Sequence, residues 1–170
     1  IRAEETDKIV NALKDAEVTI RYEEGLQQVY LNGRNITDRL REEAVGKMAS
    51  LTSAIPQVRQ KLLELQKGLA RTQDVIMDGR DIGTCVLPDA DVKIYLTASV
   101  ETRAKRRYDE LTEKGVACDL NEIARDIKER DERDSTREIA PLKQAEDAVL
   151  VDSSHMTIEE VVAAIVKLCR

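Results

Sequence analysis

With 170 residues, of which 42% are hydrophobic and 35% are charged, the chain can bury a core as one compact domain and is too apolar for a disordered protein. Its net charge of −6 argues against general nucleic-acid binding, because neutralising phosphates requires a basic face. No apolar run approaches the roughly 18 residues of a membrane-spanning helix, and no signal-peptide pattern occurs. Nucleic acids and membranes are therefore not expected as partners.

The segment 1–70 predicts a small antiparallel sheet between helices. Helices are predicted at 6–16, at 38–51 and from Pro56, a favoured first helical position. Strands are predicted at 18–22, 27–31 and 34–37. The dipeptide Asn32-Gly33 suits a tight type I′ turn between the last two strands.

From residue 74 the pattern changes to short apolar runs that each end in small or acidic residues. Strands are expected at 75–77, 92–96 and 148–151. A helix is expected at 100–114, and the last helix begins with a capping box, Thr157-Ile158-Glu159-Glu160. That helix is expected to bury Ile158, Val161, Val162, Ile165 and Leu168. Strands that alternate with helices indicate a parallel sheet, so the sequence predicts an α/β protein with an antiparallel β plus α insert near its beginning.

The stretch DGRDIGT, from Asp78 to Thr84, leaves the first expected strand at its carboxyl end. Ligands bind at this end of an open parallel sheet, and glycines allow close approach to the backbone. Two interpretations stay open for Arg80 and Asp81. They form part of a binding site, or they pair with each other in solvent, which contributes about 0–1 kcal/mol.

Arginines dominate a second region of the chain. They are Arg103, Arg106 and Arg107, then Arg125, Arg130, Arg133 and Arg137. Arg130, Arg133 and Arg137 share one helix face if a helix continues that far. A solvated helix with ion pairs of about 0.2–0.5 kcal/mol each remains an alternative, but lysine and glutamate would serve there as well. Because the arginine fork grips phosphate oxygens bidentately, the pattern favours a small phosphorylated ligand.

Histidine and cysteine content narrows the chemistry. His155 is the only histidine, so neither a histidine metal cluster nor a catalytic triad is expected. The cysteines Cys85, Cys118 and Cys169 are far apart and cannot all pair, which favours a reduced, cytoplasmic setting. Phosphoryl transfer fits these residues best, because it depends mainly on positioning and on charge stabilisation by Arg, Lys and Mg²⁺.

Four segments together resemble bacterial cytidylate kinases, which are nucleoside monophosphate kinases of the P-loop class. The segments are DGRDIGTCVLPDADVKIYLTAS (78–99), ETRAKRR (101–107), IKERDERDSTREIAPLKQAEDAVLVDSS (127–154) and LNGRNITDRLREEAVGKMASLTSAIPQVRQKLLELQ (31–66). The resemblance implies a P-loop-kinase-like parallel sheet flanked by helices, with an inserted antiparallel β plus α CMP-binding subdomain. The implied parts are a core helix (1–16), the CMP-binding insert (17–70) and a core α/β domain (71–170) with a lid around 103–130.

The resemblance also implies the site residues by position. Contacts to cytidine are implied for Ser50 and Arg59, and contacts to the base for Asp81 with Arg137. The CMP phosphate would be held by Arg80 and Arg137, and the ribose by Arg130 and Asp134. Asp78 is also implied to bind the substrate. The implied catalytic set is Arg80, Arg130 and Arg137, and the implied lid residues over ATP are Arg103, Arg106 and Arg107. A carboxylate at Asp81 can accept a hydrogen bond from the cytosine N4 amine, whereas uracil presents a carbonyl there.

The implied activity transfers the γ-phosphoryl group of ATP, with Mg²⁺, to CMP or dCMP in pyrimidine nucleotide metabolism. The protein is expected to be a cytoplasmic monomer. Two alternatives remain: a non-catalytic nucleotide-binding relative without a P-loop, and a kinase for another nucleoside monophosphate such as UMP.

One expected motif is missing from the sequence. The P-loop pattern G-x-x-x-x-G-K-[ST] is not matched, because Gly46-Lys47 is followed by Met48 and Arg41 stands where the first glycine belongs. In the family this motif and its strand precede the position of Ile1. The chain is therefore expected to be a piece of a kinase that keeps much of the CMP pocket, has no metal site of its own, lacks the first strand of the sheet and is inactive alone.

Overall fold

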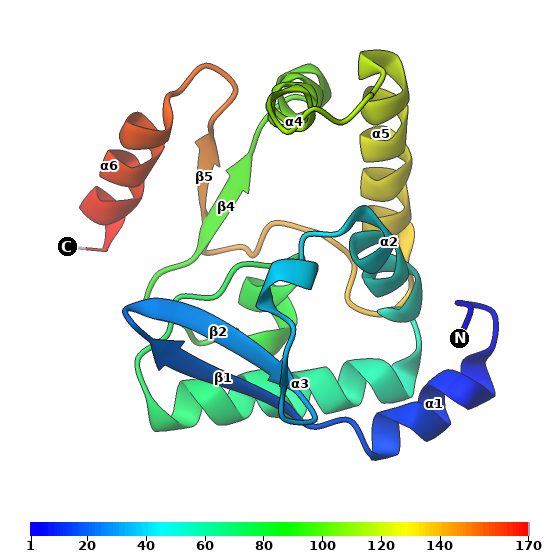
Figure 1. The fold of residues 1–170 in the computed structure, drawn as a ribbon. Coiled ribbons are helices and arrows are strands. Elements are labelled where there is room, and N and C mark those ends of the chain that lie inside the picture. Colours follow the sequence, from blue (N-terminus) through cyan, green and yellow to red (C-terminus); the bar gives the residue numbers. More distant parts are fainter. Residues whose placement is uncertain (170) are drawn as a thin grey trace. The chain divides into compact units, whose positions relative to one another are not determined.

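The computed structural model describes residues 1–169, apart from the side chain of Glu43 (Figure 1). The chain divides into two compact units, Ile1–Gly68 and the residues from Leu69 onward. The first unit contains an antiparallel sheet and the second a parallel one, and helices accompany both. The predicted α/β class is confirmed. The assignment of residues 17–70 as a CMP-binding insert stays a prediction.

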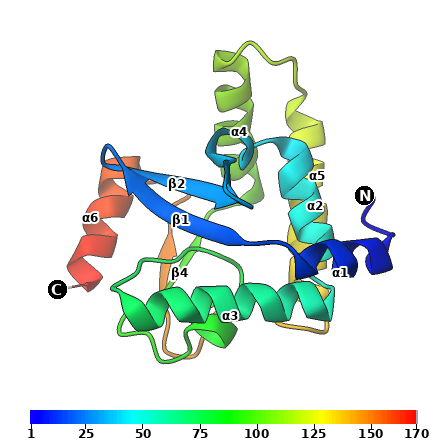
Figure 2. The same cartoon turned by 60° about the horizontal axis from the view of Figure 1, so that its bottom comes forward.

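The first unit begins with a helix and a meander of strands. These elements are α1 (Thr6–Lys14), β1 (Val18–Glu23), β2 (Leu26–Leu31) and β3 (Arg34–Asn35). Within the described residues the strands form one antiparallel sheet in the order β1-β2-β3, in which Val18 faces Leu31 and Leu31 faces Arg34. Figure 2 shows β1 and β2 paired along their length.

The turn at Asn32-Gly33 forms as predicted. Its two residues have φ angles of +50° and +77°, as a type I′ turn requires. The strand after it is shorter than the expected 34–37, because Thr37 leaves the ladder and begins a 3₁₀ turn, η1 (Thr37–Arg39). The hydroxyl of Thr37 instead accepts a hydrogen bond of 2.9 Å from the amide of Val29.

Two helices follow the antiparallel sheet in the chain. They are α2 (Glu43–Thr52) and α3 (Pro56–Thr72), and the second begins at Pro56 as predicted. The helix expected at 38–51 is wrong in its first turn, because η1 occupies that part of the chain and α2 begins only at residue 43. Val58 in α3 is buried.

The second unit alternates strands and helices. Its elements are η2 (Ile82–Val86), β4 (Ile94–Thr97), α4 (Val100–Glu113), α5 (Leu120–Thr136), β5 (Val149–Asp152) and α6 (Ile158–Leu168). The strands β4 and β5 pair in parallel, from Ile94 with Val149 to Thr97 with Asp152. The expected strands at 92–96 and 148–151 are thus confirmed to within two residues. The buried apolar side chains of this unit are Val86, Ala98, Ala104 and Val151.

The expected strand at 75–77 is wrong. These residues have no regular structure, and the side chain of Ile76 is fully exposed. A parallel strand forms only against a neighbour, and in the described part of the chain β4 pairs with β5 alone. Apolar composition without a pairing partner does not make a strand.

The last helix begins as predicted but buries less than expected. In the capping box of α6, the Thr157 hydroxyl accepts from the Glu160 amide at 3.2 Å, and the Glu160 carboxylate accepts from the Thr157 amide at 2.8 Å. Ile158 and Val162 are exposed, however, contrary to prediction. Apolar residues lie on several sides of this helix, and only the stripe that includes Val161 is partly covered.

Candidate functional site

The stretch DGRDIGT is shaped by a single turn of π-helix, η2. Asp81 precedes this turn, and its carbonyl accepts hydrogen bonds from the amides of Cys85 at 2.9 Å and Val86 at 3.3 Å. A side chain at Gly79 would place its Cβ only 2.9 Å from Cγ1 of Ile82. A larger residue at position 79 would therefore require the side chain of Ile82 to shift. Close approach of a ligand to this stretch stays a prediction.

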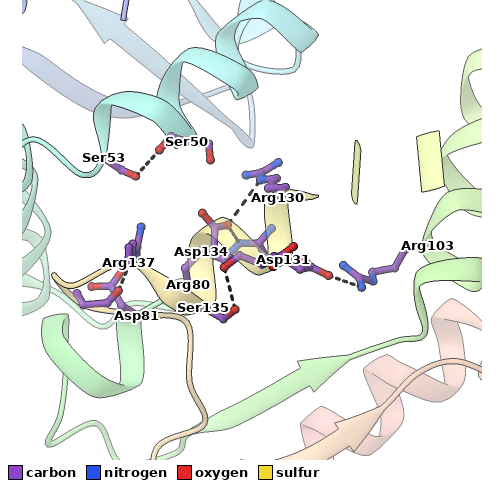
Figure 3. A network of polar contacts seen from close by, with 12 residues as sticks. Ser50, Ser53, Arg80, Asp81, Arg103, Arg130, Asp131, Asp134, Ser135 and Arg137 are labelled. Atoms are coloured by element: carbon purple, nitrogen blue, oxygen red, sulfur yellow. Dashed lines mark hydrogen bonds and ion pairs between the residues drawn. The ribbon is translucent and has the colours of Figure 1, made fainter. Parts of the chain in front are cut away.

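Arg80 binds a buried carboxylate on α5. Its Nε donates to Oδ2 of Asp134 at 3.0 Å, and Asp134 is only 3% exposed. The Nε of Arg130, one helical turn earlier on α5, lies 3.7 Å from the same oxygen. Figure 3 shows Arg80 and Arg130 near this carboxylate. A buried carboxylate is stable as an ion only when it is paired, so Asp134 and its two arginines form one unit.

Asp81 forms a second ion pair with the arginine that follows α5. Nη2 of Arg137 lies 3.7 Å from Oδ1 of Asp81, and their side chains are only 11% and 12% exposed. The helix ends at Thr136 and Arg137 has extended backbone, so the condition for a helix face shared by Arg130 and Arg137 is not met. The Nε of Arg137 donates to the carbonyl of Ala140 at 2.7 Å.

These pairings exclude one of the two interpretations of the Arg80-Asp81 dipeptide. Arg80 pairs with Asp134 rather than with its neighbour Asp81, so the exposed self-paired dipeptide is not what forms. Within the network, three arginines face two carboxylates, which leaves an excess of one positive charge. Among the described residues, the two Nη groups of Arg80 make no hydrogen bond. The network is chemically suited to an anion, because a guanidinium in this position can still grip oxygens with its Nη edge.

The three arginines expected over ATP are engaged within the second unit. Arg103 donates to Oδ2 of Asp131 at 2.6 Å and to the carbonyl of Ala98 at 3.0 Å, which connects α4 with α5 (Figure 3). Arg106 donates to the carbonyl of Ser153 at 2.6 Å and so connects α4 with the loop after β5. Contacts of these arginines with ATP stay predictions.

The third of these arginines stays within its own helix. Arg107 donates to the carboxylate of Glu110 at 2.8 Å, and Lys114 donates to the same carboxylate at 2.6 Å. The hydrogen bond from Lys114, followed by the one from Arg107, lowers the pKa of Glu110 to about 2. Glu110 therefore stays ionised in more acidic solution than an ordinary glutamate does.

Three further predicted site residues are Ser50, Arg59 and Asp78. Ser50 lies in α2, where its carbonyl accepts from the Ser53 hydroxyl at 2.8 Å. Arg59 lies in the first turn of α3. Asp78 is exposed, and within residues 1–169 it makes no ion pair. The structure therefore brings five predicted residues together in the second unit: Arg80, Asp81, Arg130, Asp134 and Arg137.

Sequence reasoning missed two participants. Asp131, which binds Arg103, is not among the predicted site residues. The charge pattern of the helix indicates that its acidic residues form ion pairs, but it does not specify which arginine is the partner of Asp131. Ala140, which holds Arg137 through its carbonyl, has no signal in the sequence.

Potential metal ligands occur among the described side chains. In the part of the chain that is described, no group of three or more His, Cys, Asp or Glu side chains could hold an ion. The two carboxylates of the network, Asp81 and Asp134, already lie against arginines. Likewise, none of the described helices is both long enough and apolar enough to cross a membrane.

The fold is thus α/β, and the chemistry of its arginine–carboxylate network is typical of proteins that bind anions. Comparison with known proteins narrows this class. The family model described as cytidylate kinase matches residues 1–170.

The chain is also similar to individual members of this family. It is 48% identical over 168 residues to the cytidylate kinase of Caldicellulosiruptor saccharolyticus, and the match covers 99% of the chain and 74% of that relative. It is 48% identical over 160 residues to the cytidylate kinase of Lactobacillus johnsonii, with 94% and 70% covered. It is 45% identical over 166 residues to that of Pseudomonas paraeruginosa, with 98% and 72% covered. The chain belongs to the cytidylate kinase family, and so to the phosphotransferases.

Proposed function

We propose that the protein transfers the γ-phosphoryl group of ATP to CMP or dCMP and forms CDP or dCDP. The observation that carries this proposal is the pair of guanidinium groups on the buried carboxylate of Asp134, in a chain of the cytidylate kinase family. Together with Arg137, these arginines supply the excess positive charge that a nucleoside monophosphate requires. We also propose that the protein acts as a cytoplasmic monomer in pyrimidine nucleotide metabolism.

The proposed reaction requires no covalent intermediate. An oxygen of the CMP phosphate, which is already ionised, forms a new bond to the γ-phosphorus of ATP. The bond from that phosphorus to the bridging oxygen breaks, and ADP leaves with the electron pair. Because the nucleophile is an anion, no general base is needed, and catalysis consists of positioning and charge stabilisation. We assign these tasks to Arg80, Arg130 and Arg137.

Mg²⁺ is proposed to arrive with ATP, where it neutralises phosphate charge. The described residues do not fit a metal site of the protein itself, so no step is assigned to the ion. Arg103, Arg106 and Arg107 on α4 are proposed to border the ATP phosphates, as part of a lid around 103–130.

Selection of the base is proposed to depend on Asp81. One of its oxygens lies 3.7 Å from Arg137, and a carboxylate has further lone pairs with which to accept from the cytosine N4 amine. Uracil has a carbonyl at this position, and a carbonyl cannot donate to a carboxylate, so neither group would be hydrogen-bonded. Ser50, Arg59 and Asp78 are proposed to complete the contacts with the nucleotide.

The test measures turnover and binding separately. ADP release is followed with CMP, dCMP, UMP and AMP for the whole encoded protein, and calorimetry measures CMP binding by the same protein. We expect rapid turnover with CMP or dCMP. Comparable rates with UMP or AMP would contradict the cytidine assignment. CMP binding without turnover would favour the non-catalytic alternative.

A further inference from the structure

Ala140 has an unusual backbone conformation. Among the described residues other than glycine, positive φ angles occur at Glu24, Asn32 and Ala140. Glu24 and Asn32 lie in two-residue hairpin turns, which require such angles. Ala140 lies in no hairpin, yet its φ is +50°. The Cβ of alanine disfavours this left-handed region.

The residue after Ala140 adds to this conflict. Pro141 restricts the preceding residue, and its ring pushes that residue toward extended backbone. The conformation of Ala140 therefore opposes the preference of its own side chain and that of the next residue. Such a conformation persists only where surrounding interactions impose it, and residues of this kind cluster at functional sites.

Two hydrogen bonds impose the turn. The carbonyl of Ala140 accepts from Nε of Arg137 at 2.7 Å. The amide of Leu142 donates to the carbonyl of Asp134 at 2.8 Å. Ala140 thus bonds to the side chain of Arg137, and Leu142 bonds to the last turn of α5. Both anchors belong to the arginine–carboxylate network.

We propose that Ala140 is a positioning residue for Arg137. Its left-handed backbone turns the carbonyl onto Nε of Arg137 and so fixes the guanidinium plane, with Nη2 directed at Asp81 (Figure 3). This inference rests on the proposed function, in which Arg137 meets the CMP phosphate and Asp81 the base. The turn then sets the geometry of the residues that bind both ends of CMP.

A purely structural role makes a different prediction. If the turn only terminates α5, substitutions at Ala140 change stability and leave the CMP affinity of the folded protein unchanged. If the turn positions Arg137, CMP affinity and the KM for CMP change, while the KM for ATP does not. The comparison of these constants separates the two roles.

The test uses two substitutions with opposite backbone preferences. Ala140→Gly removes the penalty of the positive φ, so CMP affinity should stay as in the unsubstituted protein. Ala140→Val introduces a β-branched residue that avoids this region, so CMP should bind about 10-fold more weakly, since small misplacements of binding groups are costly. Ala163→Val, on an exposed position of α6, controls for the added methyl groups.

The outcomes are distinct. If folded Ala140→Val binds CMP like the unsubstituted protein, or if Ala140→Gly weakens binding as much as Ala140→Val does, the inference is wrong.

A second measurement needs no substitution. By ¹⁵N NMR, the Nε–H of Arg137 should exchange with water much more slowly than that of the exposed Arg133, and equal rates would also overturn the inference. Even if Ala140→Val does not fold, this measurement tests the hydrogen bond on which the inference depends. Failure of the unsubstituted protein to bind CMP would contradict the proposed function, and the exchange rates would still test the position of Arg137.

Discussion

Nε of Arg80 donates to Oδ2 of Asp134 at 3.0 Å, although the two residues are 54 positions apart in the chain. The bond joins the turn before η2 to the end of α5, and Asp134 is almost fully buried there. Arg130 approaches the same carboxylate from within α5. One carboxylate thus organises two of the three arginines to which we assign catalysis.

Asp134→Asn should therefore destabilise the protein. The substitution leaves Arg80 and Arg130 without their counter-charge. Breaking a fully buried pair costs about 3–5 kcal/mol, but Arg80 is 40% exposed, so solvent screening reduces the expected loss to about 1–3 kcal/mol. Denaturant unfolding measures the change. The matched control is Asp131→Asn, one turn earlier on α5, whose pair with Arg103 is partly exposed on both sides and should cost about 0–1 kcal/mol. If both variants lose the same unfolding free energy, the burial of Asp134 does not strengthen the effect of its ion pairs on stability.

Arg80→Lys should weaken the binding of CMP but not of cytidine. Lysine keeps the positive charge but loses the Nη edge of Arg80. Charged hydrogen bonds contribute about 1.5–3 kcal/mol, so CMP affinity should fall roughly 10- to 100-fold. Calorimetry with both ligands checks this, because cytidine lacks the phosphate. Arg133→Lys, on an exposed position of α5, is the control and should change neither affinity. A parallel loss with cytidine would show that Arg80 does not contact the phosphate.

Features predicted correctly from the sequence depend on a few adjacent residues. Examples are the Asn32-Gly33 turn, the start of α3 at Pro56 and the capping box of Thr157 and Glu160. In each of them, the backbone angles or hydrogen bonds are supplied by residues that are close together in the sequence. The strand expected at 75–77 failed because a strand depends on a neighbour that local sequence does not specify. The expected burial of Ile158 failed for a related reason, since apolarity does not say which face of a helix is covered.

The same distinction applies to the site. That Arg80 and Asp81 take part in a charged cluster could be anticipated from the glycines and charges around them. Their partners could not, because Asp134 and Arg137 reach them through tertiary packing. The contribution of Ala140 was invisible, since alanine is not a residue that marks left-handed backbone.

Asp81→Asn should reduce the preference for CMP over UMP. The amide of asparagine can donate a hydrogen bond to the uracil carbonyl, which the carboxylate cannot. Because the substitution also alters the pair with Arg137, both substrates should become poorer. The informative quantity is therefore the ratio of kcat/KM for CMP to that for UMP, which should fall at least about 10-fold. An unchanged ratio would assign Asp81 a structural role.

Asp147→Asn should lower the unfolding temperature at neutral pH and have little effect in acid. The ammonium group of Lys93, which is almost buried, donates to Asp147 at 2.6 Å, and this hydrogen bond is the main cause of the lowered pKa of Asp147. Because the pKa is lower in the folded protein than its ordinary value of 3.8, the pair stabilises the fold above about pH 4. That contribution is lost as the pH falls through the folded pKa.

Thermal unfolding between pH 2 and pH 7 checks this dependence. The difference between Asp147→Asn and the unsubstituted protein should be largest near pH 7 and should shrink below pH 4. Glu146→Gln is the matched control, because this neighbouring carboxylate is exposed and makes no ion pair within the described residues. It should leave the unfolding temperature nearly unchanged at every pH. A deficit of Asp147→Asn that persists undiminished at pH 2 would mean that Asp147 stabilises the fold by packing rather than by its charge.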